Sequence, residues 1–209
     1  EEEPNLVLSM SASGDFVAVG HPFPEDATDN AGEKSGKVTV YHLVNTDWLQ
    51  KGSIIEHSSG TPFFGSSVSV SRTGLTIAIG EPGRVRVYHW QPAADDWLQC
   101  GQDIVGTDGL DAFGASVSLS ADGSVLAVGA PQSGYTRVYE YRNHTWVIKG
   151  SSILGEEAND EASDWPIGLS SDGNVVAIGA IGANRTDGVR VYEWNTTTWI
   201  NKGGVFLDV

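Results

Sequence analysis

The amino-acid sequence predicts an all-β fold made of four copies of one unit. The segment FGASVSLSADGSVLAVGAP at 113–131 recurs in altered form at 6–22, 66–82 and 165–180. Each copy is followed by a run in which apolar and polar residues alternate, the pattern of a half-buried strand. In addition, no window has the 3.6-residue apolar spacing of an amphipathic helix.

Each copy of the repeated segment is expected to form a hairpin of two strands. The second strand, such as VLAVG at 125–129, is apolar throughout and is typical of a strand that is buried on both faces. A tight turn between the two strands needs a residue with positive φ, which glycine adopts at low cost. Glycine stands there in every copy, at Gly14, Gly74, Gly123 and Gly173.

Two more strands are expected after each hairpin. The third strands are the alternating runs at 37–43, 84–90, 135–141 and 188–194, and the fourth strands lie at 48–54, 97–104, 146–153 and 199–206. All seven tryptophans occupy repeat positions, which favours a packing role over stacking on sugars. They are Trp48, Trp90, Trp97, Trp146, Trp165, Trp194 and Trp199.

Tandem four-stranded units of about 50 residues are typical of a β-propeller, in which each sheet is one blade. We expect a single propeller domain over residues 1–209, with blades at about 4–60, 61–110, 111–160 and 161–209. The units are complete, so a closed ring of four blades is one interpretation. A fragment of a larger propeller or array is the other.

The repeated motif resembles the FG-GAP repeat of integrin α-subunit propellers. Phe113-Gly114 followed by Gly129-Ala130-Pro131 carries the resemblance most closely, and Phe64-Gly65 with Gly80-Glu81-Pro82 is a second match. The fourth copy has Trp165-Pro166 and Gly179-Ala180-Ile181, and the first has Asn5 and Gly20-His21-Pro22 at these positions. The resemblance implies an extracellular propeller that binds protein ligands in cell adhesion, in rings that typically hold more than four blades.

One feature of such repeats is missing. Many carry an Asp-X-Asp-X-Asp-Gly calcium loop between the first two strands, whereas this chain has SASG, SRTG, SADG and SSDG there. One carboxylate cannot supply the six to eight oxygens that calcium takes. The resemblance therefore does not bring its calcium sites to this chain.

The acidic residues gather on one predicted face. Because antiparallel neighbours alternate in direction, the loops between strands 2 and 3 and those between strand 4 and the next blade emerge at one end. These loops hold most of the chain's 27 acidic residues, including Glu56, Glu81 and Asp103, against Lys34, Arg84 and Arg185. The opposite end has only Asp15, Asp47, Asp95, Asp96, Asp122 and Asp172.

We predict that this acidic face binds ligands, because variable loops on a rigid scaffold commonly carry function. The candidate ligand-binding residues are Glu25, Asp26, Asp29, Asp108, Asp111, Glu156, Glu157, Asp160 and Asp164. Calcium is the one ion that such oxygens suit, and its weak candidate ligands are Glu156, Glu157 and Asp160. The alternative is a solvated acidic rim without a specific ion, so no cofactor is required.

Charge and sequons narrow the class of partner and the compartment. A net charge of −15 argues against nucleic acid and favours cations or basic partners. No apolar run is long enough for membrane insertion. Asn143, Asn184 and Asn195 each begin an Asn-X-Ser/Thr glycosylation sequon, which favours a secreted or cell-surface protein. The chain opens on EEEP, which favours a processed chain or an excised piece.

The sequence thus favours a non-enzymatic extracellular module that recognises a basic protein partner through the acidic loops. A carbohydrate-binding, lectin-like propeller that takes a glycan and an architectural repeat that assembles with further repeats or chains are the alternatives. A glycosidase-like enzyme is the least favoured hypothesis, since it needs two facing carboxylates that only a structure can place.

Overall fold

The computed structural model describes residues 6–23, 36–56, 63–107, 111–155, 166–181, 187–204 and 206–207. Four antiparallel sheets contain all the strands in these residues, and the prediction of an all-β fold is confirmed. A short 3-10 helix, η1 (Pro131–Ser133), is the helical element among the described residues. No helix in this part of the chain has the length and apolar character needed to cross a membrane.

Each sheet is one blade with the same strand order. The first blade has β1 (Val7–Met10), β2 (Phe16–His21), β3 (Lys37–Val44), β4 (Asp47–Gln50) and β5 (Ile55–Glu56). The second has β6 (Ser67–Val70), β7 (Thr76–Glu81), β8 (Arg84–Gln91), β9 (Asp96–Gln99) and β10 (Ile104–Val105). The third has β11 (Ser116–Leu119), β12 (Val125–Ala130), β13 (Tyr135–Arg142), β14 (Thr145–Ile148) and β15 (Ile153–Leu154). The fourth has β16 (Ile167–Leu169), β17 (Val175–Ile181), β18 (Asp187–Trp194), β19 (Trp199–Asn201) and β20 (Phe206–Leu207).

The predicted fourth strand is interrupted in every blade. Its two pieces, β4 and β5 in the first blade, pair with opposite ends of the same third strand. Between the pieces lies a glycine with positive φ, at Gly52, Gly101, Gly150 and Gly203. A left-handed residue bends the strand there, and the sequence did not reveal the break because the residues on both sides have strand-like character.

The hairpins between the first two strands are as predicted. Gly14, Gly74, Gly123 and Gly173 have φ of 78°, 76°, 74° and 68°. The second strands β7 and β12 are buried along their whole length, whereas β2 in the first blade is only partly buried. Burial on both faces therefore requires a blade on each side, and the first blade has a neighbour on one side only in the described structure.

The blades stack through their first strands. Strand β6 lies against β1 and β2, β11 lies against β6 and β7, and β16 lies against β11 and β12. Three apolar clusters fill these blade interfaces, with Val40 and Val70 in the first, Val87 and Leu119 in the second, and Val138 in the third. Each blade is thus stabilised mainly by burial of apolar area against its neighbours.

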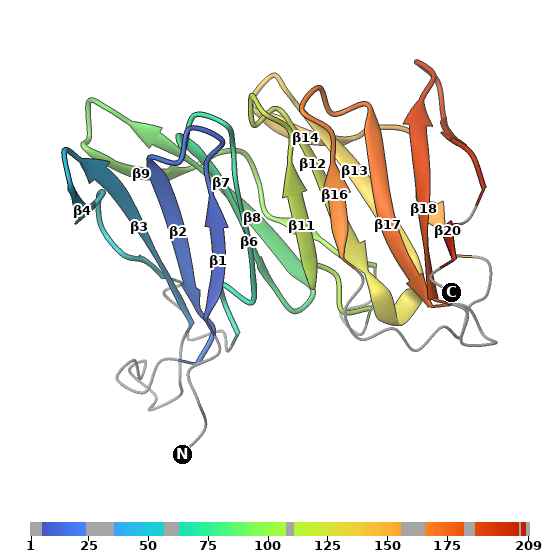
Figure 1. Ribbon diagram of the computed structural model, residues 1–209, viewed down its shortest axis with the longest axis horizontal. Coiled ribbons are helices and arrows are strands. Elements are labelled where there is room, and N and C mark those ends of the chain that lie inside the picture. Colours follow the sequence, from blue (N-terminus) through green and yellow to red (C-terminus); the bar gives the residue numbers. More distant parts are fainter. Residues whose placement is uncertain are drawn as a thin grey trace.

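The four blades form an open arc. Figure 1 shows them side by side, with the sheet of β1–β4 at one end and that of β16–β19 at the other. In the described residues, β16 has no contact with β1 comparable to those between neighbouring blades. The described arrangement is therefore open and differs from a closed four-bladed ring, which was one of the two interpretations of the sequence.

Candidate functional site

The strand register gathers the predicted acidic segments at one end of the arc. In the first blade His21 pairs with Lys37 and Lys37 pairs with Glu56, so β2 ends where β3 begins and where β5 ends. The same three strand ends meet in the other blades. We call this end of the blades the loop face. The connections 22–36, 57–66, 106–115 and 155–166 all start and finish there.

Most of the predicted ligand-binding residues fall in these connections but outside the described residues. They are Glu25, Asp26, Asp29, Asp108, Glu156, Glu157, Asp160 and Asp164, and the calcium candidates Glu156, Glu157 and Asp160 are among them. Asn184 also lies outside. For these residues the ligand, calcium and glycosylation assignments stay predictions.

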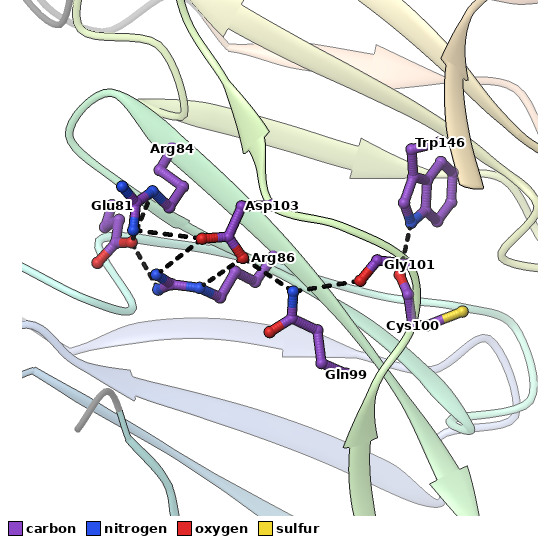
Figure 2. Close-up of polar contacts among 8 residues, drawn as sticks. All are labelled: Glu81, Arg84, Arg86, Gln99, Cys100, Gly101, Asp103 and Trp146. Carbon is purple, nitrogen blue, oxygen red and sulfur yellow. Dashed lines mark hydrogen bonds and ion pairs between the residues drawn. The ribbon is translucent and has the colours of Figure 1, made fainter. Parts of the chain in front are cut away.

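The described part of the loop face contains a charged cluster in the second blade (Figure 2). The Arg86 guanidinium donates from Nη1 to Glu81 Oε1 at 2.6 Å and from Nε to Asp103 Oδ1 at 3.0 Å. Arg84 Nη1 lies 3.3 Å from Asp103 Oδ2. Two carboxylates and two guanidinium groups therefore neutralise one another at this point.

The sequence places these four side chains by alternation and register. Arg86 stands between Val85 and Val87 on β8, so its side chain points to the opposite face of the sheet from those two. Glu81 ends β7 and is the register partner of Arg84. In the third blade the equivalent arginine has an uncharged acceptor, since Arg137 Nε donates to Ser152 Oγ at 3.1 Å.

The burial of Glu81 and Arg86 indicates that the cluster stabilises the fold and does not contact a ligand. Glu81 and Arg86 are almost fully buried, and Glu81 Oε2 has no hydrogen-bond partner in the described structure. A buried charge is tolerated only when it is paired, because removal from water costs several kcal/mol. Glu81 and Asp103 therefore belong to an ion-pair network that is buried at Glu81 and Arg86 and partly exposed at Asp103, although the sequence placed both acids on the acidic face. Only the register of the assembled sheet brings them beside Arg84 and Arg86.

The ion pairs also set the protonation state of Asp103. Partial burial acts to raise the pKa of its carboxyl, but hydrogen bonds from Arg86 and Gln99 and the positive charges of Arg86 and Arg84 outweigh that effect. The pKa of Asp103 is lowered from its ordinary value, so the carboxyl is ionised at neutral pH. It is thus suited to hold arginine and unsuited to act as a general acid.

Asp111, a predicted ligand-binding residue, holds its own loop together. Its side chain is 0% exposed, and its carboxylate accepts hydrogen bonds from the Tyr135 hydroxyl, the Thr107 N–H at 2.8 Å and the Phe113 N–H at 3.1 Å. A carboxylate that is buried in this way cannot meet a partner on the surface. Asp111 is therefore corrected from a ligand contact to a structural residue of the loop face.

The opposite face carries two of the sequons. Asn143 and Asn195 lie in the exposed connections between the third and fourth strands of their blades. The Asn195 side chain accepts hydrogen bonds from the N–H groups of Thr197 and Thr198 at 3.0 and 2.9 Å. Both side chains are accessible at turns, where glycosylation requires them to be. Their glycosylation stays a prediction.

The described residues contain no group of three or more His, Cys, Asp or Glu side chains that would hold a metal ion. The tryptophans that the sequence assigned to packing are mostly buried, but Trp48 is 43% exposed, against 6%, 3% and 8% for its equivalents Trp97, Trp146 and Trp199. The packing prediction is confirmed for Trp97, Trp146 and Trp199, whereas no blade of the described structure lies against Trp48, for which packing stays a prediction.

Comparison with known proteins supports the fold alone. No protein-family model matches the chain. No curated protein matches it either. Membership of the FG-GAP family is therefore not supported. Similar solved structures, in contrast, support a β-propeller-like architecture.

The similar solved structures come from diverse proteins. Hydrazine synthase of Kuenenia stuttgartiensis is 12% identical over 100% of this chain and 50% of its own, with a TM-score of 0.60. A putative 6-phosphogluconolactonase from Bacteroides fragilis is 13% identical over 94% of this chain and 69% of its own, with a TM-score of 0.60. KlAtg21, in complex with the coiled-coil of AgAtg16, is 12% identical over 96% of this chain and 58% of its own, with a TM-score of 0.68. The chain thus spans between half and about two thirds of these proteins, and identities this low carry no function.

Proposed function

We propose that this protein is a non-enzymatic binding module that recognises a protein partner with a basic surface through its loop face. The observation that carries the proposal is the strand register, which brings both ends of every acidic connection to one end of the blades. The blades form a rigid scaffold, and the connections differ from one another in length and composition, as is common for binding loops.

Charge supports a basic partner. The chain carries a net charge of −15, and the described ion pairs neutralise only Glu81 and Asp103 among the acids of the loop face. The acids of the connections add to a negative field at this end, which speeds the encounter with a cationic surface and selects against anionic ones.

An extracellular location is part of the proposal. It is supported by the exposure of Asn143 and Asn195 on the face opposite the loop face. Glycans at these positions would leave the loop face open to a partner.

An enzymatic role has weaker support. The similarity to a putative 6-phosphogluconolactonase comes with 13% sequence identity, which carries the fold and not the activity. In contrast, KlAtg21 was solved with a coiled-coil bound, so a propeller similar to this one does bind protein. We therefore favour protein recognition over catalysis.

The experiment compares two triple variants of equal charge against a cationic probe. E156Q/E157Q/D160N removes three acids from the connection 155–166, and D15N/D47N/D95N removes three exposed acids from the face opposite the loop face. The probe is a lysine-rich peptide, and its affinity is measured by calorimetry at two salt concentrations. We expect the loop-face variant to bind about tenfold more weakly than the wild type, and the control about as tightly as the wild type.

Three outcomes would contradict the proposal. Equal losses in the two variants would mean that only the net charge attracts the peptide. Absence of binding by the wild type at low salt would mean that the loop face does not concentrate negative charge. Hydrolysis of 6-phosphogluconolactone by the wild type, abolished by either triple variant, would overturn the non-enzymatic assignment.

A further inference from the structure

We propose that two copies of this chain associate head to tail, with the fourth blade of each copy against the first blade of the other, and close a ring of eight blades. The inference goes beyond the proposed function and does not depend on it. It rests on two contacts that recur at every blade interface in the chain and that stand half-made at the two ends of the arc, whereas a third recurring contact has no acceptor side chain in the fourth blade.

The first contact is made by the tryptophan of the fourth strand. The Nε1–H groups of Trp97, Trp146 and Trp199 each donate, at 2.8 Å, to a backbone carbonyl of the preceding blade. The acceptors are Lys51, Cys100 and Lys149. The equivalent tryptophan of the first blade is Trp48, which is 43% exposed.

The equivalent of the bend that accepts such a tryptophan lies at the other end of the arc, in the fourth blade. The glycine after each acceptor lies under the incoming ring, so that a Cβ on Gly52 would be 2.9 Å from Trp97 Cδ1, and one on Gly101 would be 2.8 Å from Trp146 Cδ1. The equivalent Gly203 of the fourth blade has φ of +92°, as the others do, but within the described structure nothing lies within 4 Å of the Cβ position. The Lys202–Gly203 bend therefore has the shape that receives a tryptophan.

The second contact is apolar. In the second blade Val68 and Val70 are buried against Val38 and Val40 of the first, with only 8% and 9% of their own surface exposed. Their equivalents in the first blade, Leu8 and Met10, are 64% and 59% exposed. Both are larger than valine, and nothing in the described residues covers them.

The complementary apolar surface is at the far end. Val38 and Val85, which face the next blade, are 0% exposed, whereas the equivalent Val189 of the fourth blade is 41% exposed. Ala177 and Val191 are likewise half-buried, although their counterparts in the inner blades are fully buried. We call Leu8, Met10 and Trp48 the head face, and Ala177, Val189, Val191 and Gly203 the tail face.

The third contact is a hydrogen bond to a serine hydroxyl of the first strand, and the serine is present in the first three blades but not in the fourth. Ser9, Ser69 and Ser118 each accept a hydrogen bond from a backbone N–H of the following blade, from Val70, Leu119 and Leu169 at 3.0, 2.9 and 3.0 Å. The fourth blade has Gly168 at this position. A contact between the tail face and the head face would therefore lack this one bond and depend on the tryptophan and the apolar residues.

A second copy is the occupant that fits both ends at once. Head and tail are opposite halves of the interface that already joins the blades inside the chain, so one copy supplies what another lacks. Such a heterologous contact generates a ring when the rotation closes, and two arcs of four blades give eight, which is within the range of known propellers. Exposed apolar patches of this kind mark interaction sites in soluble proteins.

The test measures the mass of the full chain and of three variants by sedimentation equilibrium. The wild type is expected to approach twice its monomer mass of 22.2 kDa as its concentration rises. L8D places a charge in the head face and V189D places one in the tail face, and each is expected to weaken association by about a hundredfold or more. L98D is the control, since Leu98 is 51% exposed on the outer strand β9 and belongs to neither face. It should associate as the wild type does.

Mixing separates head-to-tail association from other modes. A mixture of L8D and V189D retains one intact head and one intact tail, so it should form a dimer about tenfold or more tighter than either variant alone. A wild type that is monomeric at all concentrations would overturn the proposal, and the faces would then be covered by further blades outside residues 1–209. Full association by V189D with loss in L8D would also overturn it, because a head-to-head dimer would be present. Circular dichroism of each variant verifies that the blades are folded.

Discussion

At the scale of single residues, Asp111 shows how a carboxylate of the loop face serves the fold. Burial alone would raise the pKa of Asp111, but hydrogen bonds from Tyr135, Thr107 and Phe113 outweigh it and lower the pKa below its usual value. Burial, together with the hydrogen bond to Asp111, raises the pKa of Tyr135 to about 12. The pair is therefore most favourable when Asp111 is ionised and Tyr135 is protonated.

This pairing predicts a pH dependence of stability. A carboxyl with a lowered pKa in the folded state stabilises the protein fully above the unfolded pKa of about 4, and that contribution is lost as the pH falls through the folded pKa. Tyr135 has a raised pKa, so its contribution is complete below pH of about 10 and is lost as the pH rises toward 12. We expect D111N to lower the free energy of unfolding by about 1–3 kcal/mol at pH 7 and by less at pH 3. Urea denaturation at both pH values measures this, and equal losses would mean that the ionised form of Asp111 is not the stabilising one.

At the scale of strands and turns, much of the blade could be predicted from the sequence. The hairpin glycines, the alternating third strands and the apolar second strands all follow local rules that act within one unit. The break in the fourth strand at Gly52 and its equivalents was missed, because the residues on both sides have strand-like character and only the fold gives the positive φ of the glycine. The pairing of Glu81 with Arg86 was missed for a related reason, since register and burial are properties of the assembled sheet.

The repeated tryptophan contact gives a prediction at this scale. W146F removes the Nε1–H that donates to the Cys100 carbonyl at 2.8 Å across the second and third blades, and it leaves a partly buried acceptor without its donor. We expect a loss of about 1–3 kcal/mol in the free energy of unfolding, from urea denaturation at neutral pH. The matched control is W48F, since Trp48 occupies the same repeat position but is exposed in the first blade. Below the concentration at which copies associate, W48F should cost less than about 0.5 kcal/mol, and a loss equal to that of W146F would contradict the interblade bond as the cause.

At the scale of the whole molecule, the chain combines a neutral interior with a strongly negative surface. The blade interfaces are apolar, and the one buried ion-pair cluster of the described residues balances its own charges. The net charge of −15 is therefore carried largely by exposed side chains and by the connections of the loop face. Such an excess of like charge favours capture of a basic partner and opposes the compact state, because the acids repel one another.

The balance between these two effects predicts how the protein responds to salt. Raising NaCl from about 0.02 M to about 0.5 M shortens the screening length and weakens the repulsion among exposed acids, whereas the buried pairs of Arg86 are screened much less. The midpoint of thermal unfolding should therefore rise by a few degrees or more, and the affinity for a cationic peptide should fall over the same range.

Calcium and magnesium chloride at matched ionic strength distinguish screening from a specific ion. Equal shifts are expected because the loop sequences match no defined calcium loop, and a larger shift with calcium alone would instead support the site predicted at Glu156, Glu157 and Asp160. A midpoint that falls with added salt would mean that attractive pairs, rather than the excess of acids, dominate the surface of this protein.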